Sequence, residues 1–218
     1  TALEYLYDEV LASRLPFLDR VIEKYHEVWE SHWHDRIAIV RKENSVKFYY
    51  ELGERCIAAF YRTHSPFAEP VIGTEVEFIF SIDNSDDYMM KGIVDRIDHD
   101  GNGNYEIHDY KSGKRAMNQY NADRDGQLAT YQVALEQSKS DVSSVKLVWH
   151  FLQHNLEVHS ARTSAQITQL VNRTKSRIDE IRGHIQNGAA FAPKESILCN
   201  WCYYWEECSA KGGTNPYI

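Results

Sequence analysis

The chain has 218 residues, a net charge of −8 and a hydrophobic fraction of 43%. This length and apolar content support a packed core in one large domain or two small ones. No run approaches the roughly 18 consecutive apolar residues of a membrane helix, and no secretory signal opens the chain. The acidic balance gives no support to non-specific nucleic-acid binding by bulk charge, although it is compatible with a local basic groove. We expect a cytoplasmic protein with no membrane partner.

The first third of the chain is predicted to be helical. Apolar residues recur at three- and four-residue steps in residues 17–33, and residues 45–64 show similar spacing. Pro66 and Pro70 then interrupt the pattern. The chain starts at Thr1 without an initiator Met and enters a helical rhythm at once, which suggests that further sequence precedes it.

Alternating side chains replace the helical rhythm from residue 74, and this is typical of a strand. The two sets are Val76, Phe78 and Phe80 on one face and Glu75, Glu77 and Ile79 on the other. Polar turns at 83–87 and 98–104 separate this strand from further strands at 88–97 and 105–112. The region is therefore predicted to be a β-meander.

The second half of the chain returns to mixed structure. A helix is predicted at 125–138, a hairpin from strands at 145–153 and 156–162, and a long helix at 164–188. The apolar stripe of the long helix comprises Ile167, Leu170, Val171, Ile178, Ile181 and Ile185. The order of helices, three strands, helix, two strands and helix predicts an α/β fold with a central mixed sheet flanked by helices.

The twelve residues from Asp98 to Asp109 (DHDGNGNYEIHD) match the spacing of a calcium-binding EF-hand loop in part. Such a loop needs a helix on each side, whereas the flanking segments here have strand-like or glycine-containing sequences. The last position is Asp rather than the usual Glu. The preferred interpretation is a solvated turn in which Asp98, Asp100 and Asn102 have no ligand role.

With this turn in place, a hairpin brings Asp95 beside Asp109. Asp109 and Lys111 then share one face of their strand, while Tyr110 points to the other. Two carboxylates can hold Mg²⁺, and an ammonium group can orient a water and stabilise charge, which suits phosphodiester hydrolysis. Glu77 on the neighbouring strand could add a carboxylate. A surface Asp–Lys pair without a catalytic role is an equally good interpretation of these residues alone.

Three of the four cysteines form a C-x₂-C-x₅-C pattern near the end of the chain: Cys199, Cys202 and Cys208. Thiolates at this spacing converge readily on a metal ion or an iron–sulfur cluster. Zinc, held with a histidine or a fourth thiolate, is an alternative to the cluster. Cys56 stands alone in a helical segment, where a buried structural thiol is the preferred interpretation.

The segment GIVDRID…EIHDYKSGK resembles the signature of PD-(D/E)XK nucleases, particularly the RecB-like branch that includes the CRISPR-adaptation nucleases. The matching positions are Gly92, Asp95, Arg96, Asp109, Tyr110, Lys111, Ser112 and Gly113. A second segment, QLATYQVAL, resembles the Gln-x-x-x-Tyr motif of that branch through Gln127 and Tyr131. The resemblance extends from about residue 74 to residue 208 and implies a restriction-endonuclease-like core.

The resemblance implies a metal-dependent active site. Asp95 and Asp109 would bind Mg²⁺ or Mn²⁺, together with a backbone oxygen of Tyr110. Lys111 would be the catalytic lysine, and Glu77 is a further, weaker catalytic candidate. The residues expected to contact DNA are Gln127, Tyr131, Lys114 and Arg115.

The cysteine tail resembles that of the iron–sulfur members of this branch. In those proteins, three such cysteines join a fourth, far upstream, to hold a [4Fe–4S] cluster, so Cys199, Cys202 and Cys208 are the expected ligands. The fourth cysteine would lie before Thr1, as would a metal-binding histidine that the branch often has. Cys56 is the less favoured substitute for the fourth ligand.

We therefore expect one nuclease domain over residues 1–218, with a helical part at 1–70, a catalytic sheet core at 71–163, and a C-terminal helix and cysteine-containing tail at 164–218. The expected activity is that of a metal-dependent deoxyribonuclease, acting as an exonuclease on DNA ends or single strands in DNA repair, recombination or defence. The sequence leaves open whether a helicase or another DNA-processing protein is a partner. The alternative is a catalytically incomplete nucleic-acid-binding or assembly module with the same fold.

Overall fold

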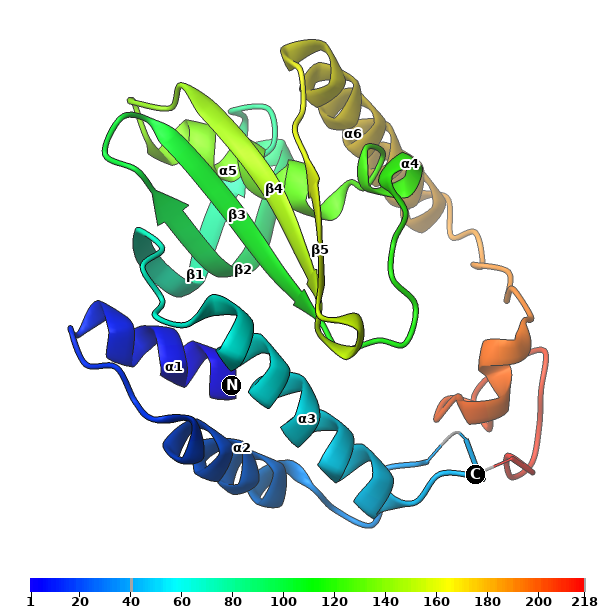
Figure 1. Cartoon of the computed structure of the whole chain (residues 1–218). Helices are drawn as coiled ribbons and strands as arrows, with labels where there is room; N and C mark the ends of the chain where they lie inside the picture. The colour runs from blue at the N-terminus through cyan, green and yellow to red at the C-terminus, as the bar shows by residue number, and fades with distance from the viewer. Residues whose placement is uncertain (40, 218) are drawn as a thin grey trace.

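The computed structural model describes residues 1–39 and 41–217. A five-stranded sheet lies between two layers of helices (Figure 1). One layer contains α1 (Ala2–Leu11), α2 (Leu18–His32) and α3 (Val46–His64). The other contains α5 (Gln127–Ser138) and the first half of α6 (Ser164–Gln186), which pack on the opposite face of the sheet. This arrangement confirms the predicted α/β fold with a central sheet flanked by helices.

The sheet has the strand order β1-β2-β3-β4-β5. The strands are β1 (Val71–Ser81), β2 (Met89–His99), β3 (Asn104–Lys111), β4 (Ser144–Phe151) and β5 (Leu156–Ser160). Neighbouring strands are antiparallel except for β3 and β4, which are parallel. A parallel pair needs a long crossover, and here the crossover passes through α4 (Gln119–Ala122) and α5. The 3₁₀ turns are η1 (Asp86–Tyr88), η2 (Leu152–His154) and η3 (Ile197–Trp201).

Helix α1 anchors the helical layer on the sheet. The Thr1 hydroxyl caps the helix by accepting a hydrogen bond from the backbone N–H of Glu4 at 3.1 Å. Leu6 and Tyr7 are fully buried in a cluster that also contains Phe60 of α3. Burial of each such side chain contributes about 1.5–3 kcal/mol. The helical layer is therefore packed firmly against the sheet, and α1 begins next to β1.

Gly92 on β2 allows the sheet and α5 to approach closely. A Cβ atom on residue 92 would lie 2.5 Å from Cε1 of Tyr131, so Gly92→Ala should destabilise the protein by about 1–3 kcal/mol, the usual cost of overpacking. Urea unfolding measures this change. The matched control is Gly183→Ala in α6, where nothing lies within 4 Å of the Cβ position and alanine is the better helix former. Equal destabilisation by both substitutions would contradict the proposed contact.

Asp98 differs from its predicted place in a solvated turn. It belongs to β2 and is only 3% exposed, because its charge is balanced by Arg96, whose Nε lies 2.9 Å from Oδ1 of Asp98. The turn between β2 and β3 is shorter, and in it Asp100 accepts hydrogen bonds from the backbone N–H groups of Asn102 and Asn104. Strands, not helices, flank this turn. The EF-hand alternative is therefore wrong.

The apolar stripe of α6 is only partly buried. Leu170 is 7% exposed and packs on α5, whereas Ile181 and Ile185 are 43% and 64% exposed. The second half of the helix extends past the edge of the sheet, toward the cysteine tail (Figure 1). Across residues 1–39 and 41–217, no helix combines the length and apolar character that a membrane crossing requires.

Candidate active site

The predicted hairpin brings Asp95, Asp109 and Lys111 together. The β2–β3 ladder ends at the pair Arg96–His108. Beyond it, the backbone N–H of Tyr110 donates to Oδ2 of Asp95 at 2.7 Å, so the Asp95 side chain turns toward β3. Nζ of Lys111 lies 3.0 Å from Oδ1 and 2.8 Å from Oδ2 of Asp109. Two carboxylates and one ammonium group therefore meet where the two strands separate.

Helix α5 holds the lysine from the other side. Nζ of Lys111 donates to Oε1 of Gln127, at the first residue of α5, at 3.0 Å. Alternation along β3 therefore works as predicted, with Asp109 and Lys111 on the face that meets α5. Tyr110 points to the helical layer, where its hydroxyl accepts a hydrogen bond from Nη1 of Arg96 at 3.1 Å. Arg96 thus fixes the strand segment whose N–H group orients Asp95.

The electrostatics of the two aspartates reflect their burial and proximity. Burial raises the pKa of Asp109, the nearby Asp95 raises it further, and Lys111 offsets part of this rise. Burial also raises the pKa of Asp95, opposed by the Tyr110 N–H and by Lys111. The ammonium group of Lys111 therefore does not fully compensate the negative charge of the two aspartates. A bound cation would relieve the excess negative charge.

Glu75 is the third carboxylate, and the sequence did not single it out. The β1–β2 register pairs Thr74 with Arg96 and Val76 with Val94, which places Glu75 opposite Asp95. Burial raises the pKa of Glu75, and the charge of Asp95 raises it further. Glu75 also has a positive φ of 45° in a strand, a sparsely populated conformation that is typical of functional sites.

Glu77 lies two residues further along β1, and the structure does not bring it to this group. It stands opposite Ile93, and its carboxylate forms a largely exposed ion pair with Lys91 at 2.7 Å. Alternation gives Glu75 and Glu77 the same face of the strand, so only the strand register separates them. Glu75 is therefore the better candidate for a ligand next to Asp95.

The donor set fits a hard divalent cation. Carboxylate oxygens are the ligands that Mg²⁺ and Mn²⁺ prefer. Oδ2 of Asp109 is buried and forms an ion pair with Nζ of Lys111 at 2.8 Å, so a metal would share this oxygen with the ammonium group. Among the described residues, the ligand atoms of Glu75, Asp95 and Asp109 do not all lie within 4.8 Å of one another, so a bound ion would draw them inward.

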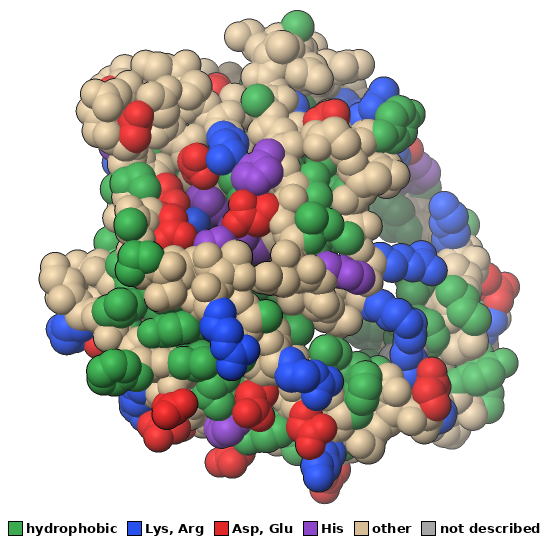
Figure 2. All heavy atoms as spheres, in the orientation of Figure 1, with side chains coloured by type: hydrophobic (Ala, Val, Ile, Leu, Met, Phe, Trp, Pro, Cys, Tyr) green, Lys and Arg blue, Asp and Glu red, His purple; other side chains and the backbone are tan. Residues whose placement is uncertain are grey.

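A cleft of about 1070 Å³ opens beside these residues and is shared by the sheet and the helical layer. Glu75, Asp95 and Lys114 line its sheet side. The helical layer and the loop before α3 contribute aromatic side chains and a further cation: Tyr25, Trp29, Phe48, Tyr49 and Arg41. In Figure 2, Lys and Arg side chains border the recess between the body of the protein and its C-terminal segment.

A family assignment follows from comparison with known proteins. The family model described as "PD-(D/E)XK nuclease superfamily" matches residues 1–209. The chain belongs to this superfamily. The match includes β2 and β3, and therefore Asp95, Asp109 and Lys111.

Two solved structures are similar to this PD-(D/E)XK chain at low identity. A protein from Eubacterium rectale, described as "Putative exonuclease", is 12% identical over 93% of this chain and 73% of that chain, with a TM-score of 0.49. SSO0001 is 18% identical over 89% of this chain and 96% of that chain, with a TM-score of 0.39. No curated protein matches the chain. The assignment therefore rests on the family model.

The predicted DNA-contacting residues of this PD-(D/E)XK protein occupy three different settings. Gln127 binds Lys111, as described above. Tyr131 is partly buried against the sheet, where it packs over Gly92. Lys114 and Arg115 are exposed, and Lys114 lines the cleft. The lysine and arginine are thus accessible to a ligand, whereas Tyr131 has a packing role.

The cysteine tail is partly exposed. Cys199 lies in η3, Cys202 directly follows it, and Cys208 lies further along the tail. Cys56 is buried in α3, and burial raises the pKa of its thiol. The setting of Cys56 therefore matches that of a structural thiol.

Asp95→Asn should stabilise the fold when metal is chelated. The folded-state pKa of Asp95 is raised above its unfolded value, so its contribution to stability is fully present below the unfolded pKa and is lost as pH rises through the folded pKa. At pH 7 the ionised carboxylate therefore destabilises the fold, and an amide oxygen can still accept the Tyr110 N–H. We expect a gain on the order of 1 kcal/mol at pH 7, which vanishes toward about pH 4.

Thermal unfolding of wild type and Asp95→Asn in EDTA, as a function of pH, measures this difference. Added Mg²⁺ should raise the melting temperature of wild type and leave the variant nearly unchanged, because a ligand stabilises only the state that binds it. A variant that is less stable than wild type at pH 7 would contradict the charge argument.

Proposed function

We propose that this protein is a metal-dependent deoxyribonuclease of the RecB-like type, acting as an exonuclease on DNA ends or single strands. The supporting observations are the grouping of Asp95, Asp109 and Lys111 and the cleft that Asp95 lines together with aromatic and cationic side chains. Aromatic rings stack on unpaired bases, and cations bind the phosphate backbone. The proposal extends to one nuclease domain over residues 1–218 with a role in DNA repair, recombination or defence.

The residues have separable roles in phosphodiester hydrolysis. A bound Mg²⁺ or Mn²⁺ would lower the pKa of a water and neutralise phosphate charge. Asp95, Asp109 and Glu75 would hold the cation through carboxylate oxygens. The ammonium group of Lys111, fixed between Asp109 and Gln127, would orient the attacking water or donate to a phosphate oxygen as negative charge develops.

The test compares a linear single-stranded oligonucleotide with a closed circular strand of the same sequence. Each carries an internal label and is incubated with the protein in Mg²⁺, Mn²⁺ or EDTA, and products are followed by denaturing gel electrophoresis. We expect degradation of the linear strand in either metal and none in EDTA. Preferential cutting of the circle would make the protein an endonuclease. Binding of DNA without cleavage in both metals would support the non-catalytic module instead.

We also propose that Cys199, Cys202 and Cys208 hold a [4Fe–4S] cluster together with a fourth ligand. Their spacing supports thiolate ligation. Anaerobically purified protein should show a broad visible absorption that Cys202→Ser removes. Stoichiometric zinc at this tail, with no iron, would contradict the cluster.

A further inference from the structure

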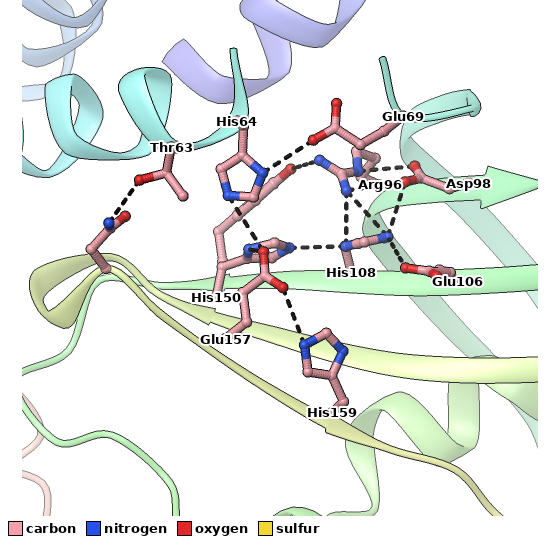
Figure 3. A network of polar contacts seen from close by, with 12 residues as sticks. Thr63, His64, Glu69, Arg96, Asp98, Glu106, His108, His150, Glu157 and His159 are labelled. Atoms are coloured by element: carbon pink, nitrogen blue, oxygen red, sulfur yellow. Dashed lines mark hydrogen bonds and ion pairs between the residues drawn. The ribbon is translucent and has the colours of Figure 1, made fainter. Parts of the chain in front are cut away.

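A second group of convergent ligand atoms lies on the helical-layer face of the sheet (Figure 3). His64 at the end of α3, His150 on β4 and Glu157 on β5 each direct one atom to a common point, all within 4.8 Å of one another. Nε2 of His64 and Nδ1 of His150 lie 3.4 Å and 3.3 Å from Oε1 of Glu157. None of these three residues belongs to the active site described above.

The contact on the far side of His64 orients its ring. Nδ1 of His64 lies 3.1 Å from Oε1 of Glu69. The other ring nitrogen, Nε2, then points to Glu157. A histidine oriented by a carboxylate behind it is the usual arrangement of a metal ligand.

A chain of contacts also orients His150. Nε2 of His150 lies 2.9 Å from Nδ1 of His108, and His108 is in turn held by Asp98 and Arg96 at 3.2 Å and 3.0 Å. Nδ1 of His150 therefore points toward Glu157.

One nitrogen of each imidazole thus faces the same carboxylate oxygen of Glu157. Neighbouring ligands of a tetrahedral Zn²⁺ with bonds of 2.0–2.1 Å are separated by about 3.3–3.4 Å. The measured separations of 3.4 Å and 3.3 Å match this spacing.

The surroundings leave room for an ion and a water. A cavity of about 60 Å³ is lined by the three residues together with Phe60 and other side chains of α3, β4 and η2. A single water needs roughly 10–15 Å³ on this measure. The rings are held in place, since Phe60 stacks on His64 at 4.1 Å and contacts His150 edge-on at 5.5 Å between ring centroids.

We propose that His64, His150 and Glu157 form a second metal site that takes Zn²⁺, or a similar nitrogen-preferring transition metal, with water as the fourth ligand. Two imidazoles and a carboxylate suit such ions rather than Mg²⁺. The site joins the end of α3 to β4 and to the edge strand β5, and is therefore structural. Asp98, Glu106 and His108 also converge, but the guanidinium of Arg96 already lies 3.0 Å from Asp98 and His108.

The experiment titrates Co²⁺, a spectroscopic substitute for Zn²⁺, into the full chain. Cys199, Cys202 and Cys208 are replaced by serine to keep the metal off the tail, and excess Mg²⁺ occupies the active site. We expect one equivalent to bind with the visible bands of a tetrahedral complex and without a thiolate charge-transfer band. Competition with Zn²⁺ should then remove the bands.

Glu157→Gln and His64→Ala should each weaken Co²⁺ binding by about 10²-fold or more, whereas the exposed His34→Ala should leave it unchanged. Circular dichroism melts in EDTA show whether each variant is folded. Glu157→Gln, at a residue that is 36% exposed in its side chain, is the milder change. Absence of tetrahedral bands in the parent, or binding of parental strength in folded Glu157→Gln, would overturn the proposal.

Discussion

Asp109→Ala and Lys111→Met should each reduce DNA cleavage by about 10²–10⁴-fold, the range found when a catalytic acid–base group or a charge-stabilising group is removed. Asp109 offers a buried carboxylate close to Asp95. Lys111 supplies the cation closest to both aspartates. The two substitutions therefore remove different parts of one site.

Metal binding distinguishes their roles. Asp109→Ala removes a ligand, so the affinity for Mn²⁺ should fall. Lys111→Met removes a positive charge next to the ligands, so the affinity for Mn²⁺ should stay the same or rise. Isothermal titration with Mn²⁺, together with cleavage rates at saturating metal, measures both quantities for each variant.

Lys91→Met is the matched control. Lys91 lies on β2 of the same sheet, but its partner is the exposed carboxylate of Glu77. Exposed pairs of this kind contribute about 0–1 kcal/mol, and we expect normal cleavage and metal binding. Full activity of both Asp109→Ala and Lys111→Met, or an equal loss in Lys91→Met, would refute the assigned site.

Local sequence patterns were sufficient to predict the fold and the meeting of Asp95, Asp109 and Lys111. Period-two alternation located β1 to β3, and turn residues located the connection that brings Asp95 to Asp109. Alternation along β3 also predicted that Lys111 shares a face with Asp109, which the 3.0 Å contact confirms. These inferences depend on residues that are close in sequence, where backbone geometry alone decides which side chains meet.

Long-range contacts account for what the sequence did not reveal. The choice between Glu75 and Glu77 depends on the register of β1 against β2, because both side chains have the same parity along the strand. The burial of Asp98 depends on the packing of α1, because the ring of Tyr7 covers its partner Arg96 at 4.3 Å. From the sequence alone, a charged residue such as Asp98 is expected to be exposed to solvent, because its ion-pair partner is not known.

The sequence could not predict the histidine-rich group for a similar reason. His64, His150 and Glu157 come from three elements that are distant in sequence, and no fixed spacing links them. Only the packing of α3 over β4 and β5 brings them together. A signal exists in hindsight, since the chain contains ten histidines, yet their number alone does not indicate which of them converge.

Glu75→Gln should reduce cleavage and Mn²⁺ affinity by about 10–100-fold, a range typical of losing a group that supports a metal site. The register places this carboxylate opposite Asp95, and the charge of Asp95 raises its pKa. Glutamine keeps the size of the side chain and removes its charge.

Glu77→Gln provides the comparison on the same strand and face. Loss of the Glu77 charge breaks only the exposed ion pair with Lys91. Cleavage, Mn²⁺ affinity and the pH–rate profile should therefore all remain as in wild type. The reverse result, with Glu77→Gln impaired and Glu75→Gln active, would return the third carboxylate to Glu77. It would also mean that β1 shifts its register against β2 when DNA and metal bind, because Glu77 lies opposite Ile93 in the structure described here.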